Sequence, residues 1–140
     1  MKQINTMNNV FSYLGHTHDM HRMINNKAEM TVSSIQKIRQ DIQKSKKILK
    51  NQMYFAYPFG KYTDNNITAL RQENFRLAFT VQPNYVTTKS NHYLLPRFSV
   101  YPNTSDLEFA EMVMGEYSNI KYNINTKNGK SIYKASNVKW

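Results

Sequence analysis

Short, nearly continuous apolar runs alternate along this chain with segments that have the apolar spacing of a helix. The runs fall at residues 10–16, 53–57, 76–81 and 95–101. The predicted helices cover residues 33–50, 65–74 and 105–117. Apolar strands that alternate with helices are typical of a parallel sheet or barrel. The pattern therefore predicts an α/β fold.

Capping residues mark where each predicted helix begins. The capping-box pairs are Ser33 with Gln36 and Ser105 with Glu108, and the middle helix has Thr63 or Asp64 as its cap. The polar stretch RMINNKAEMT (22–31) has no clear period and predicts a loop.

The last part of the chain has a different pattern. The segment IKYNINTKNGKSIYKA alternates apolar and polar residues on both sides of Asn128-Gly129. This dipeptide is a strong signal for a β-hairpin turn. We therefore expect a main domain over residues 1–117 and an appended hairpin and tail over 118–140.

Composition limits the chemistry that is open to the chain. With 140 residues it is long enough for one domain with a hydrophobic core. It has no cysteine, which excludes disulfides and thiolate metal sites, so any metal must be held by nitrogen and oxygen. No apolar run is long enough to cross a bilayer, and the N-terminus lacks the apolar region of a signal peptide.

The net charge of +10 has three open interpretations. An excess of lysine and arginine is typical of nucleic-acid binding. However, the densest basic run, residues 44–50, falls on a predicted helix, where a solvated face is the plainer explanation. A basic surface also suits contact with an anionic cell wall.

The motif GHTHDMH (residues 15–21) holds three of the chain's four histidines. On a helix, His16 and His21 would lie about 140° apart and could not share an ion. At the end of a strand that leads into a loop they can converge, and catalytic groups gather at such ends in parallel α/β folds. We expect a metal site here, although the spacing does not settle which two histidines bind.

Four motifs in order, GHTHDMH, FAYPFGKYTD, FRLAFTVQPNYV and YLLPRFSVY, resemble the second half of the polysaccharide deacetylase domain, the nodulation-type deacetylase fold. The similarity covers roughly residues 5–110 and is strongest to biofilm poly-N-acetylglucosamine deacetylases. It implies part of a distorted (β/α) barrel, to which the C-terminal hairpin is an extension. The N-terminal MKQINTMNNV would match a helix that leads into the histidine strand.

The resemblance also implies roles for individual residues. His16 and His21 would hold a divalent metal, usually zinc, while His18 and Asp19 would shape the loop between them. The backbone N–H of Tyr57 would help to form an oxyanion hole, and Arg97 would orient the catalytic aspartate. Tyr57, Pro58 and Phe59 would contact the substrate.

The pair of adjacent aspartates that supplies the general base and a metal ligand in this family has no match here. None of the four aspartates adjoins another acid. A catalytic zinc usually has three protein ligands, and general-base catalysis is worth about 10²- to 10⁴-fold. We therefore expect a hydrolase of carbohydrate amide bonds whose chain alone binds metal weakly and hydrolyses little.

Three functions follow, in order of preference. The first is metal-dependent removal of N-acetyl groups from an N-acetylglucosamine polysaccharide, by a truncated or split domain. The second is a non-catalytic glycan-binding or interaction module that keeps the fold. The third, nucleic-acid binding, has charge alone in its favour. By resemblance the protein would act outside the cell or at its surface.

Overall fold

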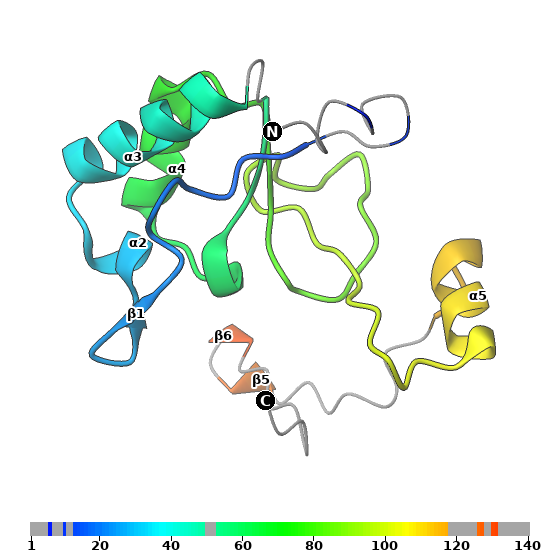
Figure 1. The fold of residues 1–140 in the computed structure, drawn as a ribbon. Helices are drawn as coiled ribbons and strands as arrows, with labels where there is room; N and C mark the ends of the chain where they lie inside the picture. Colours follow the sequence, from blue (N-terminus) through cyan, green and yellow to red (C-terminus); the bar gives the residue numbers. More distant parts are fainter. Residues whose placement is uncertain are drawn as a thin grey trace. The chain divides into compact units, whose positions relative to one another are not determined.

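The computed structural model describes residues 13–49 and 53–117, together with Thr6, Val10, 126–127 and 130–131 (Figure 1). By contacts the chain divides into two units, Met1–Ser99 and Val100–Trp140.

Four segments of the first unit pair side by side and in parallel. The central pair is β3 (Tyr54–Ala56) and β4 (Leu77–Phe79), with Phe55 opposite Ala78. Gly15 forms a parallel bridge with Phe55, and Leu95 forms one with Phe79. All four predicted apolar runs thus contribute to one parallel arrangement, although each contributes fewer residues than the runs contain.

The fourth run shows why the strands are shorter than predicted. Leu95 pairs with β4, donating its N–H to Ala78 O at 2.9 Å. Pro96 follows and has no N–H to donate. The N–H of Arg97 then bonds Gln82 O, in the loop after β4. The sheet pairing expected over residues 95–101 therefore stops at its first residue.

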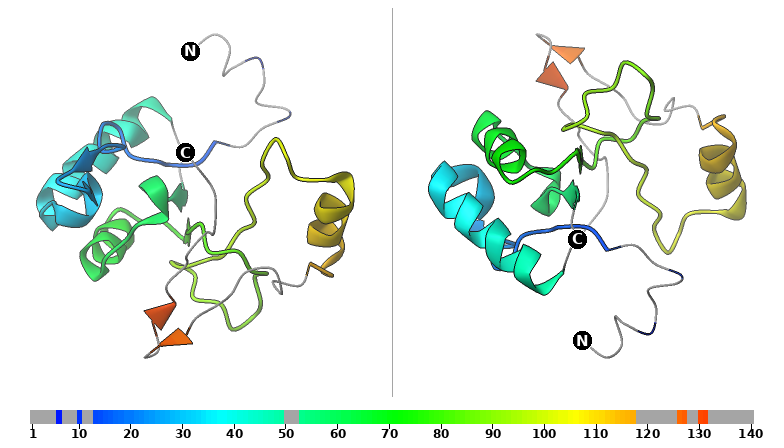
Figure 2. Two further views of the ribbon diagram at one scale, coloured as in Figure 1. Left: turned by 90° about the horizontal axis from the view of Figure 1, so that it is seen from below. Right: turned by 90° about the horizontal axis from the view of Figure 1, so that it is seen from above.

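Helices α3 (Ile35–Ile48) and α4 (Asp64–Gln72) lie side by side next to the strands (Figures 1 and 2). α4 has a complete capping box, formed by Thr63 and Asn66. The capping box predicted for Ser33 and Gln36 is wrong, because the hydroxyl of Ser34 caps α3 by accepting the N–H of Lys37.

The stretch predicted as a loop at 22–31 contains a small hairpin and a helical turn. β1 (Met23–Ile24) pairs antiparallel with β2 (Lys27–Ala28), and α2 (Glu29–Val32) follows. Between the strands, Asn25 and Asn26 have φ values of 49° and 61°. Two consecutive positive φ values match a two-residue hairpin turn, which asparagine tolerates better than most residues. The Asn-Asn pair was the missed signal.

The core of the first unit lies between the strands and the two helices. Its largest side chains include Phe55, Tyr57 and Phe75, whose rings meet edge to face around Phe55 at centroid distances of 5.6 and 5.4 Å. The helices contribute buried aliphatic residues, namely Ile38, Ile42, Ala69 and Leu70. Burial of these side chains fixes where the ends of the strands lie.

The second unit contains α5 (Asp106–Met114), with the predicted capping box between Ser105 and Glu108. β5 (Thr126–Lys127) pairs antiparallel with β6 (Lys130–Ser131), which confirms the hairpin register around Asn128-Gly129. The turn itself and the rest of 118–140 lie outside the described residues, and so does most of the predicted N-terminal helix. Across the part of the chain that is described, no helix is both long and apolar enough to span a membrane.

Candidate metal and active site

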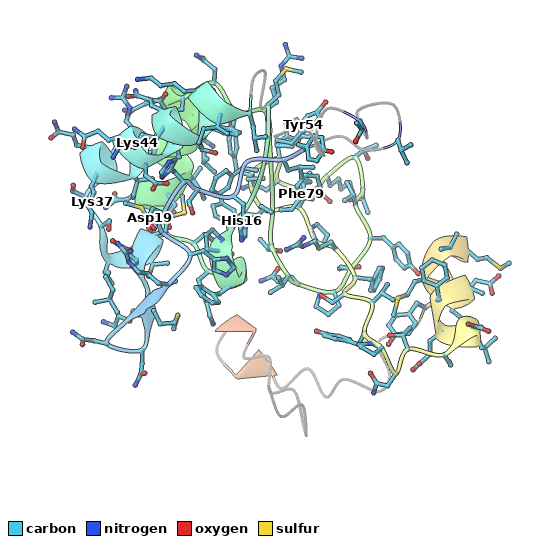
Figure 3. The ribbon with its side chains drawn as sticks, viewed as in Figure 1. His16, Asp19, Lys37, Lys44, Tyr54 and Phe79 are labelled. Atoms are coloured by element: carbon cyan, nitrogen blue, oxygen red, sulfur yellow. The ribbon has the colours of Figure 1, made fainter. Side chains whose placement is uncertain are left out.

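His16 and His21 converge beyond the carboxyl end of β3 (Figure 3 labels His16). Gly15 is held against β3 by two hydrogen bonds of 2.8 Å, from its N–H to Tyr54 O and from the N–H of Ala56 to its O. His16 follows at once, and its Nε2 lies 3.2 Å from Nδ1 of His21. The predicted strand therefore delivers His16 to a loop, where His21 returns to meet it.

The tautomer of His16 follows from its other ring nitrogen. Nδ1 lies 2.7 Å from Ala56 O, and a carbonyl oxygen only accepts, so Nδ1 carries the proton. Nε2 then presents a lone pair toward His21. A histidine whose far nitrogen is fixed by a backbone carbonyl is the usual form of a metal ligand.

The spacing of the two nitrogens fits a shared ion. Nitrogens that each lie about 2.0–2.1 Å from one tetrahedral zinc ion are about 3.3 Å apart, close to the 3.2 Å found between His16 and His21. The donor set is imidazole nitrogen, which suits zinc. Among the described residues, however, no group of three or more histidines, aspartates and glutamates is placed to hold an ion.

Asp41 of α3 holds the loop between the two histidines. Its carboxylate oxygens accept the backbone N–H groups of His18 and Asp19, at 2.7 and 2.8 Å. The carboxylate is therefore a fixed anchor for the turn that returns His21 to His16. Sequence reasoning missed Asp41, although an acid on the buried stripe of α3 beside Ile38 and Ile42 was a usable signal.

A small cavity of about 320 Å³ opens over this loop and is lined by His16, Thr17, His18, Asp19, His21 and Arg22. The carboxylate of Asp19 is largely exposed and lies 3.4 Å from the guanidinium of Arg22, which also binds Glu29. The expectation that His18 and Asp19 shape the loop agrees with their backbone contacts to Asp41.

Burial lowers the pKa of His16, the hydrogen bond to Ala56 opposes this effect, and electrostatic interactions with His21 and Arg97 lower the pKa further. A lower pKa keeps the imidazole neutral at physiological pH, which is the state that a metal ligand needs.

Tyr57 belongs to the core. Its ring is buried, its O–H donates to Tyr93 O at 3.1 Å, and burial raises the pKa of its phenol. Its backbone N–H donates to Phe79 O at 3.1 Å. That N–H is therefore engaged with β4, and the buried ring does not reach substrate. In this structure, a different residue must therefore supply the oxyanion N–H and the substrate contact that were expected of Tyr57.

Phe59 is the exposed residue of the same motif. It lies in the 3₁₀ turn η1 (Pro58–Gly60) with a φ of 55°, and the residue is 40% exposed. The ring meets His21 edge-on at a centroid distance of 4.4 Å. Pro58 is buried. Among the residues that the structure describes, nothing accepts the N–H of Phe59.

Arg97 lies near His16, at the same end of the parallel segments. Its Nε donates to Thr80 O at 2.8 Å, and its charge acts on His16. Since the fourth parallel segment ends at Leu95, Arg97 lies just beyond a strand end, as His16 does. His16, His21, Phe59 and Arg97 thus gather at one end of the parallel segments.

No protein-family model matches the chain. Curated proteins do match part of it. The chain is 34% identical over 91 residues to the poly-β-1,6-N-acetyl-D-glucosamine N-deacetylase of Staphylococcus aureus strain MRSA252, covering 61% of this chain and 31% of that protein. It is 33% identical over 107 residues to the enzyme of the same name from Staphylococcus epidermidis, covering 71% and 37%. The chain thus spans about a third of the length of the curated relatives that it matches.

Solved structures share the fold. The Streptococcus pyogenes deacetylase PplD in complex with acetate superposes with a TM-score of 0.66 and 23% identity, over 79% of this chain and 49% of that one. IcaB from Ammonifex degensii superposes with a TM-score of 0.60 and 23% identity, over 76% and 47%.

These matches confirm the predicted fold class, part of the distorted (β/α) barrel of the polysaccharide deacetylases. Within that class, the curated sequence relatives are the poly-N-acetylglucosamine deacetylases that the four motifs predicted, and they match over part of their length.

Proposed function

We propose that this chain is part of a metal-dependent polysaccharide N-deacetylase, which hydrolyses N-acetyl groups of an N-acetylglucosamine polymer. The observation that carries the proposal is the convergence of His16 Nε2 and His21 Nδ1 at 3.2 Å. Because Nδ1 of His16 is bonded to Ala56 O, Nε2 keeps a lone pair that can bind an ion. The curated relatives, whose name states this activity, support the choice of substrate class. By the same analogy we propose that the protein acts at the cell surface or outside it.

In this proposal His16 and His21 hold a divalent ion, zinc. When bound, such an ion lowers the pKa of a coordinated water and polarises a carbonyl, which is the chemistry that amide hydrolysis needs. The residues of this chain contribute the neutral imidazoles and the loop that Asp41 fixes. The third ligand and the general base come from residues outside the histidine cluster.

We assign the oxyanion donor to the backbone N–H of Phe59. Oxyanion stabilisation requires a donor that is already oriented and not used elsewhere. The N–H of Tyr57 is used by Phe79, whereas the N–H of Phe59 has no acceptor among the described residues and its ring lies beside His21. The exposed ring of Phe59 contacts the sugar, and Arg97 orients the acidic partner of the site.

Acetate release from oligomers of N-acetylglucosamine, with and without a chelator, tests the activity. We expect this chain alone to release little acetate, because the sequence has no adjacent aspartates. Activity should rise when the chain is joined to the aspartate-bearing half of a related deacetylase, and His16→Ala should abolish that gain. Release that the chelator leaves unchanged would overturn the metal-dependent mechanism.

A non-catalytic glycan-binding module is the second candidate. It is favoured by the absence of a third metal-ligating side chain near His16 and His21 in the described ranges. The exposed ring of Phe59 would serve sugar stacking in that case as well. Binding of the oligomer that is independent of zinc and lost in Phe59→Ala, with no hydrolysis in the joined protein, would favour this module over the enzyme.

A further inference from the structure

A second cavity, of about 850 Å³, lies at the opposite end of the strands from the histidines. Met53 and Arg76 line it and directly precede β3 and β4, whereas the histidine site uses the carboxyl end of β3. Three cationic residues, Lys46, Arg71 and Arg76, also line this cavity. Its described lining contains no aspartate or glutamate.

Two of the cations are held in place by aromatic rings. Nζ of Lys46 lies 4.5 Å from the ring centre of Phe75 and donates to Glu73 O. The guanidinium of Arg71 lies 4.9 Å from the ring centre of Tyr93. Tyr93 in turn donates its O–H to Phe75 O at 2.7 Å. Because these cationic side chains are already ordered, less conformational entropy is lost when a ligand binds.

The carboxylate of Glu73, whose backbone oxygen accepts from Lys46, is bound to other residues. Oε1 of Glu73 accepts from Nε of Arg39 at 2.7 Å and from the amide of Gln43 at 2.9 Å. Within the described parts of the chain, neither Arg71 nor Arg76 forms a salt bridge with an acid. The cavity therefore gathers three positive charges, and no described acidic side chain forms a salt bridge with any of them.

We propose that Lys46, Arg71 and Arg76 form a binding site for a phosphate-bearing ligand. A single carboxylate would be satisfied by one guanidinium, whereas two guanidinium forks and an ammonium match the several oxygens and the double charge of a phosphate group. The cavity is larger than one phosphate group, so it has room for a phosphate that belongs to a larger molecule. The site uses residues apart from the histidines and is independent of the deacetylase proposal.

Titration of the full chain with pyrophosphate in metal-free, low-salt buffer, followed by calorimetry and amide NMR shifts, tests this site. We expect one-to-one binding that Arg76→Gln weakens about tenfold, as expected for the loss of one charge-assisted hydrogen bond. Arg71→Lys keeps the charge but loses the fork, and it should weaken binding less. Lys44→Gln removes a charge from the exposed face of the same helix as Lys46 and serves as the matched control.

Inorganic phosphate and a short oligothymidylate are titrated in the same way as pyrophosphate. The comparison distinguishes a small phosphorylated ligand from a nucleic acid. Tighter binding of pyrophosphate than of the oligonucleotide, kept in His16→Ala, supports a small phosphorylated ligand at this cavity. Equal loss of affinity in Lys44→Gln and Arg76→Gln would instead show a diffuse basic surface and overturn the site. Absence of binding by all three probes, with the chain folded by circular dichroism, would overturn it too.

Discussion

The carboxylate of Asp41 accepts the backbone N–H of His18 at 2.7 Å, across 23 positions of sequence. The second oxygen of the same carboxylate accepts the N–H of Asp19. A buried side chain of α3 thereby sets the path of the chain between His16 and His21. The distance between the two ring nitrogens therefore depends on the conformation of this loop.

Asp41→Ala should weaken metal binding at the histidine pair. Outer contacts that orient metal ligands are worth about 10- to 100-fold in affinity, and the lost hydrogen bonds should also lower the free energy of unfolding by about 1–3 kcal/mol. Asp41→Asn keeps one acceptor oxygen and should give an intermediate affinity. Zinc calorimetry and urea unfolding measure both effects, with the exposed Asp64→Asn as control. Unchanged zinc affinity in Asp41→Ala would show that the loop holds its shape without this anchor.

Zinc binding should depend on both histidines. In His16→Ala and in His21→Ala the remaining imidazole is a lone ligand, and we expect affinity to fall by about tenfold or more. His92→Ala, which removes the histidine outside the cluster, should leave it unchanged. Calorimetry at neutral pH compares the three variants, and affinity should fall as the pH drops and the imidazoles become protonated. Equal effects of all three substitutions would refute the assigned site.

Gly60→Ala should destabilise the chain more than Gly115→Ala. Both glycines have positive φ, 64° and 82°, where an alanine is strained by about 1 kcal/mol. A Cβ on Gly60 would also clash with Cγ2 of Val81, whereas no atom of the described residues lies within 4 Å of a Cβ on Gly115. Thermal unfolding should therefore show a larger loss at Gly60. The opposite order would mean that the turn after Phe59 can open away from Val81.

Tyr57→Phe tests whether Tyr57 is structural. The substitution removes only the O–H that donates to Tyr93 O and should cost about 1 kcal/mol of unfolding free energy. Because the ring is buried and the backbone N–H is bonded to Phe79, zinc affinity and any acetate release should stay as in the parent chain. Phe59→Ala is the counterpart, since it should reduce binding of the sugar oligomer while sparing stability. A selective loss of sugar binding in Tyr57→Phe would restore its expected role.

Glu29 should contribute stability at neutral pH that is lost in acid. Its hydrogen bond to Lys37 lowers the pKa of the carboxyl below its ordinary value of 4.5, with Arg22 acting in the same direction and burial against it. A carboxyl with a lowered folded-state pKa stabilises the fold above the unfolded-state value, and this contribution disappears as pH falls through the folded-state value.

Glu29→Gln should therefore be less stable than the parent chain near neutral pH, by about 1–2 kcal/mol once solvent screening of the half-exposed partners is allowed for. The difference should shrink below pH 4.5. Denaturant unfolding at a series of pH values measures it, with the exposed Glu116→Gln as control. A difference that is constant with pH would mean that shape rather than charge at Glu29 matters.

The sequence by itself determined the order of the longer helices and of the parallel strands, because apolar runs and capping residues act over a few neighbouring positions. The runs that became β3 and β4, the capping box at Ser105 and the hairpin register around Asn128-Gly129 were all predictable in this way. The four motifs likewise predicted the deacetylase fold.

Tertiary structure alone decided which groups meet. Asp41 reaches His18 and Asp19 from another element, and the N–H of Tyr57 is taken by Phe79, 22 residues on. The buried stripe of α3 marks Asp41 but not the backbone groups that it binds, and nothing near Tyr57 in the sequence points to Phe79. Both partners depend on how α3 and β4 pack against the rest of the chain. The cations around Phe75 were likewise scattered in sequence and came together only when the strands and helices closed the core.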